Sequence, residues 1–286
     1  MTTQTETTGS SILVTGGANG KTGRRVAERL RARDAAVRAG SRAGQPPFDW
    51  ADRSTWQPAL TGTNAAYVSY FPDLGSPGAP EAIDEFAQAA LNVGTSRLVL
   101  LAGRGEEEAL RAEQALRDSD AEWTVLRCSW FAQNFSENFL LGPVLAGEVA
   151  LPVDAIPEPF LDADDVAEVA VAALTEEGHA GRVYELTGPR LLTFGEAVGE
   201  IAQASGRDIR YKPISIEKFT AGLAQAGVPD ELVSLVAYLF ADVMLDGRNA
   251  HLTDGIRRAL GREPGDFRDY VRRTAATGAW AGSEAG

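Results

Sequence analysis

Hydrophobic and polar positions along the chain form blocks that predict strands followed by helices. Short apolar, β-prone runs predict six strands, at 12–15, 36–39, 65–70, 97–101, 123–127 and 182–186. Apolar residues at helical spacing predict helices at 21–33, 81–92, 106–118 and 164–174. Strands that alternate with helices build a parallel sheet covered on both faces. We therefore predict an α/β fold with a doubly wound sheet of the Rossmann type.

The pattern changes after residue 190, where the remaining segments read as helices. Thr193 and Glu196 predict a capping box at the start of one helix, and Gly206 predicts its end. Further helices are predicted at 215–226, 230–243, 253–260 and 266–275. We expect a disordered tail (1–10), a Rossmann-type domain (11–190), a smaller helical region beside a cleft (191–280) and a second disordered tail (281–286). A crossing segment, 128–160, is rich in aromatic residues, glycine and proline, and is expected to line the cleft.

The first predicted strand leads into the first helix through a glycine-rich turn. Glycine stands at every third position from Gly17 to Gly23. Such a turn presents the amides of a helix N-terminus to a pyrophosphate, and glycine is needed where the backbone turns or approaches the ligand. A triphosphate-binding loop is disfavoured because Thr15 stands where that motif requires glycine. A ligand-free turn is the alternative to a dinucleotide site made by Gly17, Asn19, Gly20, Lys21, Thr22 and Gly23.

Composition narrows the classes of function. The 286 residues are 44% hydrophobic, enough for a full core, and the net charge of −13 without a basic cluster disfavours nucleic-acid binding. Cys128 is the single cysteine, which excludes an internal disulfide. His179 and His251 lack Cys or His neighbours at ligand spacing, so no metal site is expected. No apolar run approaches the length of a membrane span and the first residues show no signal-peptide core, which predicts a cytoplasmic protein without membrane partners.

Five motifs in a fixed order resemble one protein family. They are Gly17-Ala18-Asn19-Gly20-x-x-Gly23, Val37-Arg38-Ala39-x-x-Arg42, the strand 123–127, Trp130-Phe131-x-x-Asn134-Phe135, and 186–189. Together they resemble the NmrA-like group of atypical short-chain dehydrogenases/reductases, over residues 11–280. The resemblance implies a Rossmann-type fold and a nicotinamide cofactor. It also implies either a reductase of quinones, azo dyes or triphenylmethane dyes, or a non-catalytic redox sensor.

The end of the second predicted strand indicates which cofactor is bound. An acidic residue there would hold the 2′-hydroxyl of NAD, whereas arginine accommodates the 2′-phosphate of NADP. Residues 37–42 contain no acid, and Ser41 and Arg42 can donate hydrogen bonds to a phosphate. We predict NADP(H) in preference to NAD(H), a solvated arginine at a strand end being the alternative.

The resemblance adds further cofactor contacts. It implies that Asp49 and Trp50 border the adenine, and that Tyr70 and Phe71 pass near the ribose, with a simple turn residue as the alternative for Asp49. Residues at the end of the fourth strand complete the expected cofactor site. The serine usual in the family is absent there, where the chain has Ala102 and Gly103.

No sequence pattern assigns the proton transfer. Many short-chain reductases use Tyr-x-x-x-Lys, in which lysine lowers the pKa of a proton-donating tyrosine. None of the six tyrosines here has a lysine four residues later. Glu113 matches a glutamate that many relatives carry in the helix after the fourth strand. It is the catalytic candidate, and a solvated helix carboxylate is the alternative.

A delocalised acceptor can be reduced without a strong protein acid, because cofactor positioning and an apolar stacking surface supply much of the catalysis. We place Trp130, Phe131 and Phe135 on that surface, with Asn134 as a polar contact, and core packing as the alternative for the aromatic side chains. Cys128 is expected to be a buried thiol rather than a redox centre. The sequence thus favours an NADP(H)-dependent reductase of a small quinone, azo or enone acceptor. An NADP(H)-binding redox sensor of the NmrA type is the alternative.

Overall fold

The computed structural model describes residues 11–282 and divides into two compact units. The first unit contains the chain up to Ala102 together with Arg111–Leu126 and Ala167–Val183. The second contains Gly103–Leu110, Arg127–Val166 and the chain from Tyr184 onward. The crossing segment therefore belongs to the same unit as the C-terminal helices, and this unit is larger than the helical region predicted at 191–280. The predicted tails at 1–10 and, apart from its first two residues, 281–286 lie outside the described residues.

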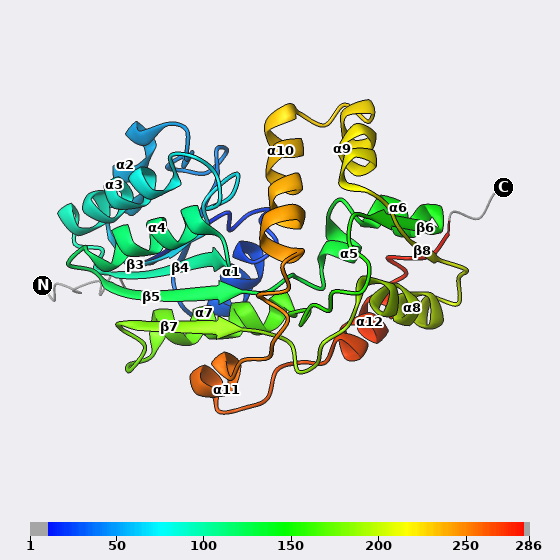
Figure 1. Ribbon diagram of the computed structural model, residues 1–286. Helices are drawn as coiled ribbons and strands as arrows, with labels where there is room; N and C mark the ends of the chain where they lie inside the picture. Colours follow the sequence, from blue (N-terminus) through cyan, green and yellow to red (C-terminus); the bar gives the residue numbers. More distant parts are fainter. Residues whose placement is uncertain (1–10, 283–286) are drawn as a thin grey trace, which may run out of the picture. The chain divides into compact units, whose positions relative to one another are not determined.

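A six-stranded sheet forms the centre of the α/β arrangement (Figure 1). Its order is β2-β1-β3-β4-β5-β7. The strand β1 pairs in parallel with β2 and β3, and β3 pairs in parallel with β4. The predicted Rossmann-type α/β fold is confirmed. The six predicted strands are present with ends within two residues of the prediction: β1 (Ser11–Thr15), β2 (Val37–Gly40), β3 (Thr63–Val68), β4 (Arg97–Gly103), β5 (Glu122–Cys128) and β7 (Arg182–Leu186).

The helices that connect these strands cover both faces of the sheet. The chain leaves β1 in one direction to reach β2, and passes in the opposite direction through β3, β4 and β5. Right-handed crossovers then place the first helix on one face and the third and fourth on the other. The four predicted helices are present as α1 (Gly23–Arg31), α3 (Ala79–Asn92), α4 (Glu107–Arg117) and α7 (Ala163–Thr175). A further short helix, α2 (Trp56–Leu60), and the 3₁₀ turn before it (Arg53–Thr55) were not predicted.

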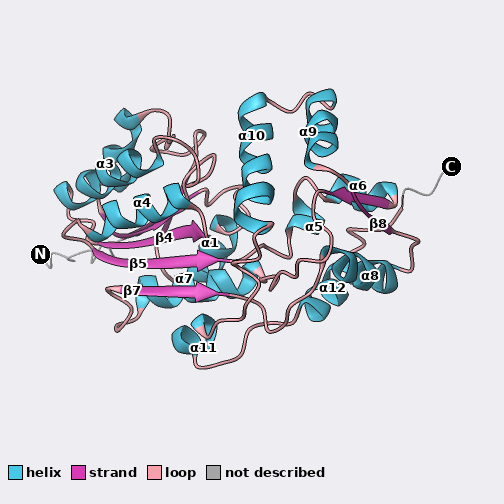
Figure 2. Cartoon of the chain, in the orientation of Figure 1, coloured by secondary structure: helices cyan, strands magenta, loops and turns pink. Residues whose placement is uncertain are grey.

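The second unit is helical apart from a small parallel sheet (Figure 2). The predicted capping box is confirmed: the Thr193 hydroxyl accepts from the Glu196 N–H at 3.1 Å, and the Thr193 N–H donates to the Glu196 carboxylate at 2.8 Å. The two strands β6 (Glu148–Leu151) and β8 (Arg210–Pro213) were not predicted. The helices are α5 (Asn134–Glu137), α6 (Leu141–Ala146), α8 (Phe194–Ser205), α9 (Ile216–Gln225), α10 (Asp230–Tyr238), α11 (Gly255–Leu260) and α12 (Phe267–Ala276), with a π-helical segment at Leu239–Met244.

Aromatic side chains form the core of the second unit. The rings of Phe160 and Phe194 meet edge to face with centroids 5.0 Å apart, a favoured arrangement for buried aromatic pairs. Trp280 is fully buried, and its indole N–H donates to the Phe135 carbonyl at 2.9 Å. Residues from the crossing segment and from the C-terminal helices therefore share one core.

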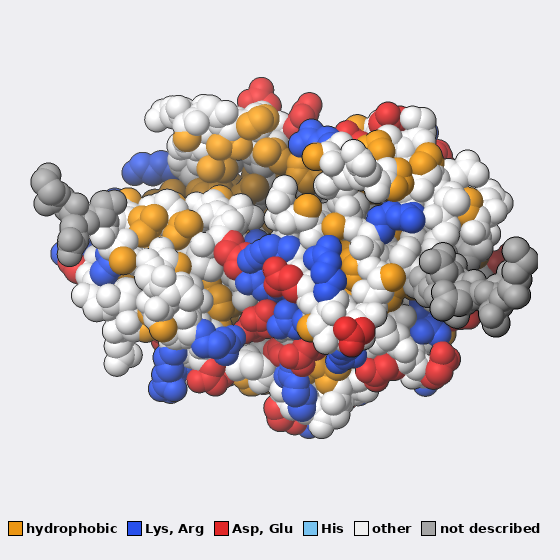
Figure 3. Space-filling view, turned by 180° about the vertical axis from the view of Figure 1, so that it is seen from behind, with side chains coloured by type: hydrophobic (Ala, Val, Ile, Leu, Met, Phe, Trp, Pro, Cys, Tyr) orange, Lys and Arg blue, Asp and Glu red, His pale blue; other side chains and the backbone are white. Residues whose placement is uncertain are grey.

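The surface carries charges of both signs. On the face shown in Figure 3, Lys and Arg are interspersed with Asp and Glu. None of the described helices has the length and apolarity needed to cross a bilayer. Among the described residues, no three His, Cys, Asp or Glu side chains come together as a possible metal site.

Candidate functional site

The glycine turn between β1 and α1 is too tight for side chains at its three key positions. A Cβ atom would lie 2.7 Å from the Val14 carbonyl oxygen at Gly17, and 2.6 Å from the Gly16 oxygen at both Gly20 and Gly23. Real Cβ atoms do not approach backbone that closely, so glycine is required by the turn itself. Hydrogen bonds close the turn: the Gly20 N–H donates to Gly16 at 2.7 Å, and the Gly17 N–H donates to Val14 at 3.0 Å.

The start of α1 lacks a side-chain cap. Thr22 occupies the N-cap position, but its hydroxyl is buried and accepts a hydrogen bond from the Tyr67 hydroxyl at 2.9 Å. Amides of a first helical turn have no intrahelical partner, so this helix start suits an anionic ligand. Thr22 would therefore contribute its backbone rather than its side chain. Asn19 is exposed and Lys21 is half-buried.

The turn that follows β2 lies beside the glycine turn. Thr15, the last residue of β1, is in register with Gly40, the last residue of β2. A Cβ at Gly17 would also lie only 3.2 Å from the Ala39 Cα, which shows how closely the two turns approach. Ser41 is half-buried and Arg42 is exposed, without a hydrogen bond or ion pair to another described residue.

Arg38, which lies within β2, has a different role from Arg42. The Arg38 guanidinium donates to the carbonyl oxygens of Ala59, at 2.6 Å, and Thr61, at 2.8 Å. These bonds fix the end of α2 against β2. Of the two arginines in this motif, Arg38 is engaged by backbone carbonyls, whereas the exposed Arg42 has no such contact with another described residue.

An aromatic group follows β2 and β3 in the same unit. Trp50 is half-buried, its indole N–H donates to Ser69 at 2.9 Å, and its ring centroid lies 5.0 Å from that of Tyr70. Asp49 uses its carboxylate to accept the Ala51 N–H at 3.0 Å, which is the turn role that the sequence left open. Phe71 is 73% exposed. Trp50 and Phe71 therefore keep surface for a ligand, whereas the Asp49 carboxylate is already engaged locally.

The end of β4 is closed by a carboxyl group. Ala102 is buried, and a Cβ at Gly103 would lie 1.7 Å from Oε1 of Glu106. A side chain at residue 103 would displace the Glu106 carboxyl group, which folds back over this position. The backbone of Ala102 and Gly103 remains the part expected to face a cofactor.

Glu113 is not the solvated carboxylate that the sequence left as the alternative. Its side chain is fully buried, on the face of α4 that also buries Ala109, Ala112 and Leu116. That placement corrects the expectation of a surface carboxylate.

The residues expected to contact the acceptor separate into two groups. Trp130, Phe131 and Asn134 are half-buried, but Phe135 has no exposed surface. Phe135 packs against Phe267, with ring centroids 5.8 Å apart, so its assignment as a stacking surface does not fit the structure. It is a core residue because α5 turns it toward the aromatic centre of the second unit.

The partly buried side chain of Trp130 packs against the aromatic core of the second unit. Its ring lies 5.3 Å from that of Phe240 and 5.6 Å from that of Phe194. Its indole nitrogen is buried and has no hydrogen-bond partner among the described residues.

Sequence reasoning missed a buried charge cluster at the ends of β4 and β5. The Arg104 side chain is 3% exposed, with Nε 3.7 Å from a Glu185 oxygen and Nη2 2.9 Å from Nε2 of His251. Arg104 also interacts electrostatically with Glu158 and Cys128. A glutamate inside an otherwise apolar and proline-rich stretch, residues 156–161, was the signal available in the sequence.

The electrostatics of this cluster differ from group to group. Burial raises the pKa of Glu158 to about 7, against the opposing effects of the Trp130 backbone N–H and of Arg104. Burial also raises the pKa of the Cys128 thiol, against the opposing effect of Arg104. The expectation that Cys128 is an inert buried thiol agrees with this placement.

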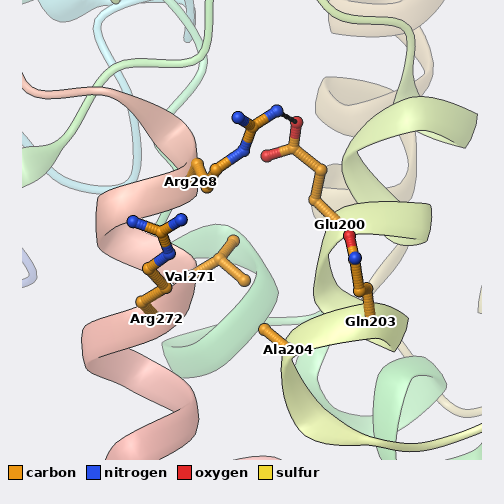
Figure 4. A pocket seen from close by; sticks show the side chains of 6 residues that line it. All are labelled: Glu200, Gln203, Ala204, Arg268, Val271 and Arg272. Atoms are coloured by element: carbon orange, nitrogen blue, oxygen red, sulfur yellow. Dashed lines mark hydrogen bonds and ion pairs between the residues drawn. The ribbon is translucent and has the colours of Figure 1, made fainter.

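A pocket of about 470 Å³ opens between α8 and α12 (Figure 4). Its cationic side chains are already paired: Arg268 lies 3.4 Å from Glu200, and Arg272 lies 3.5 Å from Asp269. None of the expected cofactor or acceptor residues lines it. The pocket is therefore not a candidate for hydride chemistry; its lining residues are Glu200, Gln203, Ala204, Arg268, Val271 and Arg272.

The fold and the sequence of this chain are similar to those of known reductases. The fold matches Citrobacter sp. triphenylmethane reductase complexed with NADP(H), with a TM-score of 0.71 and 20% identity over 92% of this chain and 99% of that one. It matches the NADPH complex of Escherichia coli quinone oxidoreductase 2 with the same TM-score, identity and coverage. In sequence, the uncharacterized oxidoreductase YesF of Bacillus subtilis is 31% identical over 279 residues, which cover 93% of this chain and 95% of YesF. The chain belongs to the NmrA-like family.

Membership in the NmrA-like family confirms what the five sequence motifs indicated. No family model matches the chain. The NmrA-like likeness extends through both units, because the relatives are matched over nearly their whole lengths.

Proposed function

We propose that this protein is an NADP(H)-dependent oxidoreductase that transfers a hydride to a small conjugated acceptor of the quinone, azo or enone type. The observation that carries the proposal is the glycine turn, in which three glycines exclude side chains at the start of an uncapped helix. The cofactors of the two solved relatives, NADP(H) and NADPH, support it. The acceptors of those relatives, triphenylmethane dyes and quinones, support the class of acceptor.

Residues of the first unit can be assigned to each part of an NADP(H) molecule. The turn at Gly17–Gly23 and the start of α1 would hold the pyrophosphate, and Ser41 and Arg42 would hold the 2′-phosphate. The half-buried Trp50 would border the adenine, with Tyr70 and Phe71 beside the ribose. When bound, the reduced nicotinamide supplies the hydride.

The protein's own contribution is to bind and orient the two reactants. Trp130 and Phe131 are half-buried and offer apolar surface to a flat acceptor, and Asn134 offers a polar group beside them. Stacking of this kind holds an acceptor in a reactive orientation, which lowers the barrier without covalent chemistry. The absence of Tyr-x-x-x-Lys from the sequence disfavours ordinary carbonyl reduction and favours delocalised acceptors.

Trp130→Ala and Phe131→Ala should each lower quinone turnover about tenfold or more while the Kd for NADPH changes little. The reason is that the acceptor surface is removed, whereas the cofactor is held by residues of the first unit. Steady-state kinetics with varied quinone and calorimetry with NADPH measure the two effects separately.

Trp130 also packs on Phe240, so its removal costs stability as well as stacking surface. Phe219→Ala is the matched control, because Phe219 is buried against Phe240, with ring centroids 5.3 Å apart. It should lower the melting temperature without a comparable loss of turnover. Equal losses of turnover in Phe219→Ala and Trp130→Ala would show that packing alone explains the effect.

The proposal is tested most directly by NADPH oxidation with a panel of quinones, azo dyes and enones. We expect oxidation with at least one acceptor class, and a higher kcat/KM with NADPH than with NADH. Tight NADPH binding without oxidation by any acceptor would contradict the reductase. That result would favour the redox sensor, which binds the same cofactor but transfers no hydride.

A further inference from the structure

Glu158 has a buried carboxyl group near the carboxyl end of β5. In parallel α/β folds, ligand sites lie at the carboxyl ends of the strands. The Glu158 backbone is fixed by two hydrogen bonds with Leu192, of 2.8 and 3.1 Å. Its carboxyl Oε1 accepts the Trp130 N–H at 3.1 Å, and Trp130 follows the last residue of β5 by two positions. The side chain is thus held just past the carboxyl end of β5, and the carboxyl ends of the strands are where ligands bind in open sheets.

The charge that faces Glu158 is the guanidinium of Arg104, from the segment after β4. Arg104 is shared with other partners: Glu185 of β7 at 3.7 Å, His251 at 2.9 Å and the Asn249 carbonyl at 3.3 Å. Because Glu185 already compensates the guanidinium, Arg104 does not force Glu158 to ionise. Burial dominates instead, and the carboxyl group keeps a large protonated fraction at neutral pH.

The reaction proposed above consumes one proton for each hydride transferred, and a protonated carboxyl group beside the acceptor can supply it. A hydride adds two electrons to a quinone or enone, and the resulting anion becomes stable product when an oxygen or nitrogen gains a proton. The sequence lacks the Tyr-x-x-x-Lys donor. Glu158 is held by the backbone of Trp130, whose side chain is part of the expected acceptor surface.

We propose that the Glu158 carboxyl group is the general acid that protonates the acceptor. This inference rests on the proposed reductase function and names a catalytic residue for it. As the hydride reduces the acceptor, the carboxyl O–H bond breaks and a new bond forms from that proton to the acceptor's oxygen or nitrogen. The Trp130 N–H and Arg104 then stabilise the carboxylate, and water returns the proton before the next turnover.

Glu158→Gln tests the proposal with little change in shape. The amide oxygen can still accept the Trp130 N–H, but the side chain has no acidic proton to give. We expect an unchanged Kd for NADPH and a kcat for quinones lower by about 100-fold, the lower range for loss of a general acid. The deficit should be largest for acceptors whose reduced form is the weaker acid.

The pH profile separates catalysis from structure. In the wild-type protein kcat should fall above about pH 7, because the proton-donating form of Glu158 is lost. In Glu158→Gln this alkaline limb should be absent. Glu148→Gln is the matched control, since Glu148 is an exposed carboxylate in β6 paired with Lys212 at 3.9 Å, and it should leave both kcat and the profile unchanged.

Thermal unfolding gives a readout that does not depend on activity. The folded pKa of Glu158 is raised above its ordinary value of 4.5, so the unfolded chain loses this proton first as pH rises. This carboxyl therefore destabilises the wild-type protein progressively between about pH 4.5 and 7, and the penalty persists above pH 7. The melting temperature of Glu158→Gln relative to wild type should rise over the same interval.

Each outcome bears on a different claim. If wild-type protein reduces quinones but Glu158→Gln keeps its kcat, or keeps the alkaline limb at reduced kcat, the general-acid role is overturned. A flat wild-type profile from pH 6 to about 8.5 overturns it without any variant. If wild-type protein oxidises NADPH with no acceptor, the proposed function itself fails.

Discussion

Replacing Gly20 with valine should abolish NADPH binding. A Cβ at this position would lie 2.6 Å from the Gly16 carbonyl oxygen and 3.3 Å from its carbonyl carbon, and both neighbours are backbone. The turn must therefore open, which moves the first amides of α1 away from the positions a pyrophosphate requires. The obstruction lies within the turn's own backbone, so the clash does not depend on the ligand. Isothermal calorimetry should detect no heat of NADPH binding.

The fold should survive this change because β1 and α1 are held by other contacts. Val26, Ala27 and Leu30 of α1 remain buried, and β1 remains paired with β2 and β3. Gly199→Val in α8 is the control, since nothing lies within 4 Å of a Cβ at that glycine. Circular dichroism checks that both variants are folded. A folded Gly20→Val protein with wild-type NADPH affinity would remove the dinucleotide site from this turn.

Arg42→Ala should weaken NADPH binding by roughly tenfold to a hundredfold and leave NADH binding nearly unchanged. A charge-assisted hydrogen bond to phosphate is typically worth about 1.5–3 kcal/mol, which corresponds to that range of Kd. The guanidinium is exposed, so its removal leaves the core intact. Calorimetric titration with each cofactor measures the ratio directly.

Arg31→Ala provides the matched control for net charge. Arg31 is exposed and ends α1, at the opposite end of that helix from the glycine turn. It should change the affinity for neither cofactor by more than about twofold, because charges beyond a Debye length are largely screened. Equal losses for NADPH and NADH in Arg42→Ala would refute recognition of the 2′-phosphate.

Local sequence determined most of the elements of the fold. The central strands are apolar runs such as Leu98–Leu100, buried on both faces, and the helices between them carry their apolar residues at regular spacing. The strand β8 was missed because Arg210–Pro213 is largely exposed and has no apolar run to indicate it. Its pairing with β6 depends on contacts across about 60 residues of chain.

The candidate site was predictable where the constraint was local. The glycines from Gly17 to Gly23 are required by atoms only a few residues away, so the sequence alone carried the signal. Burial of Phe135 depends on partners far along the chain, including Trp280, whose indole bonds its carbonyl. Arg104 and Glu158 likewise meet only when separate strand ends are assembled. Such contacts leave no periodic trace in the sequence.

The interleaving of the two units constrains how this protein can be recombined. The chain passes from one unit to the other near Ala102, Leu110, Leu126, Val166 and Val183. A chimaera made with a relative by a single crossover would therefore combine core segments from two different parents in at least one unit. Transfer of acceptor preference between family members should require joint exchange of the segments at 103–110, 127–166 and from 184 onward. Gene shuffling at one junction is expected to yield mostly misfolded chains.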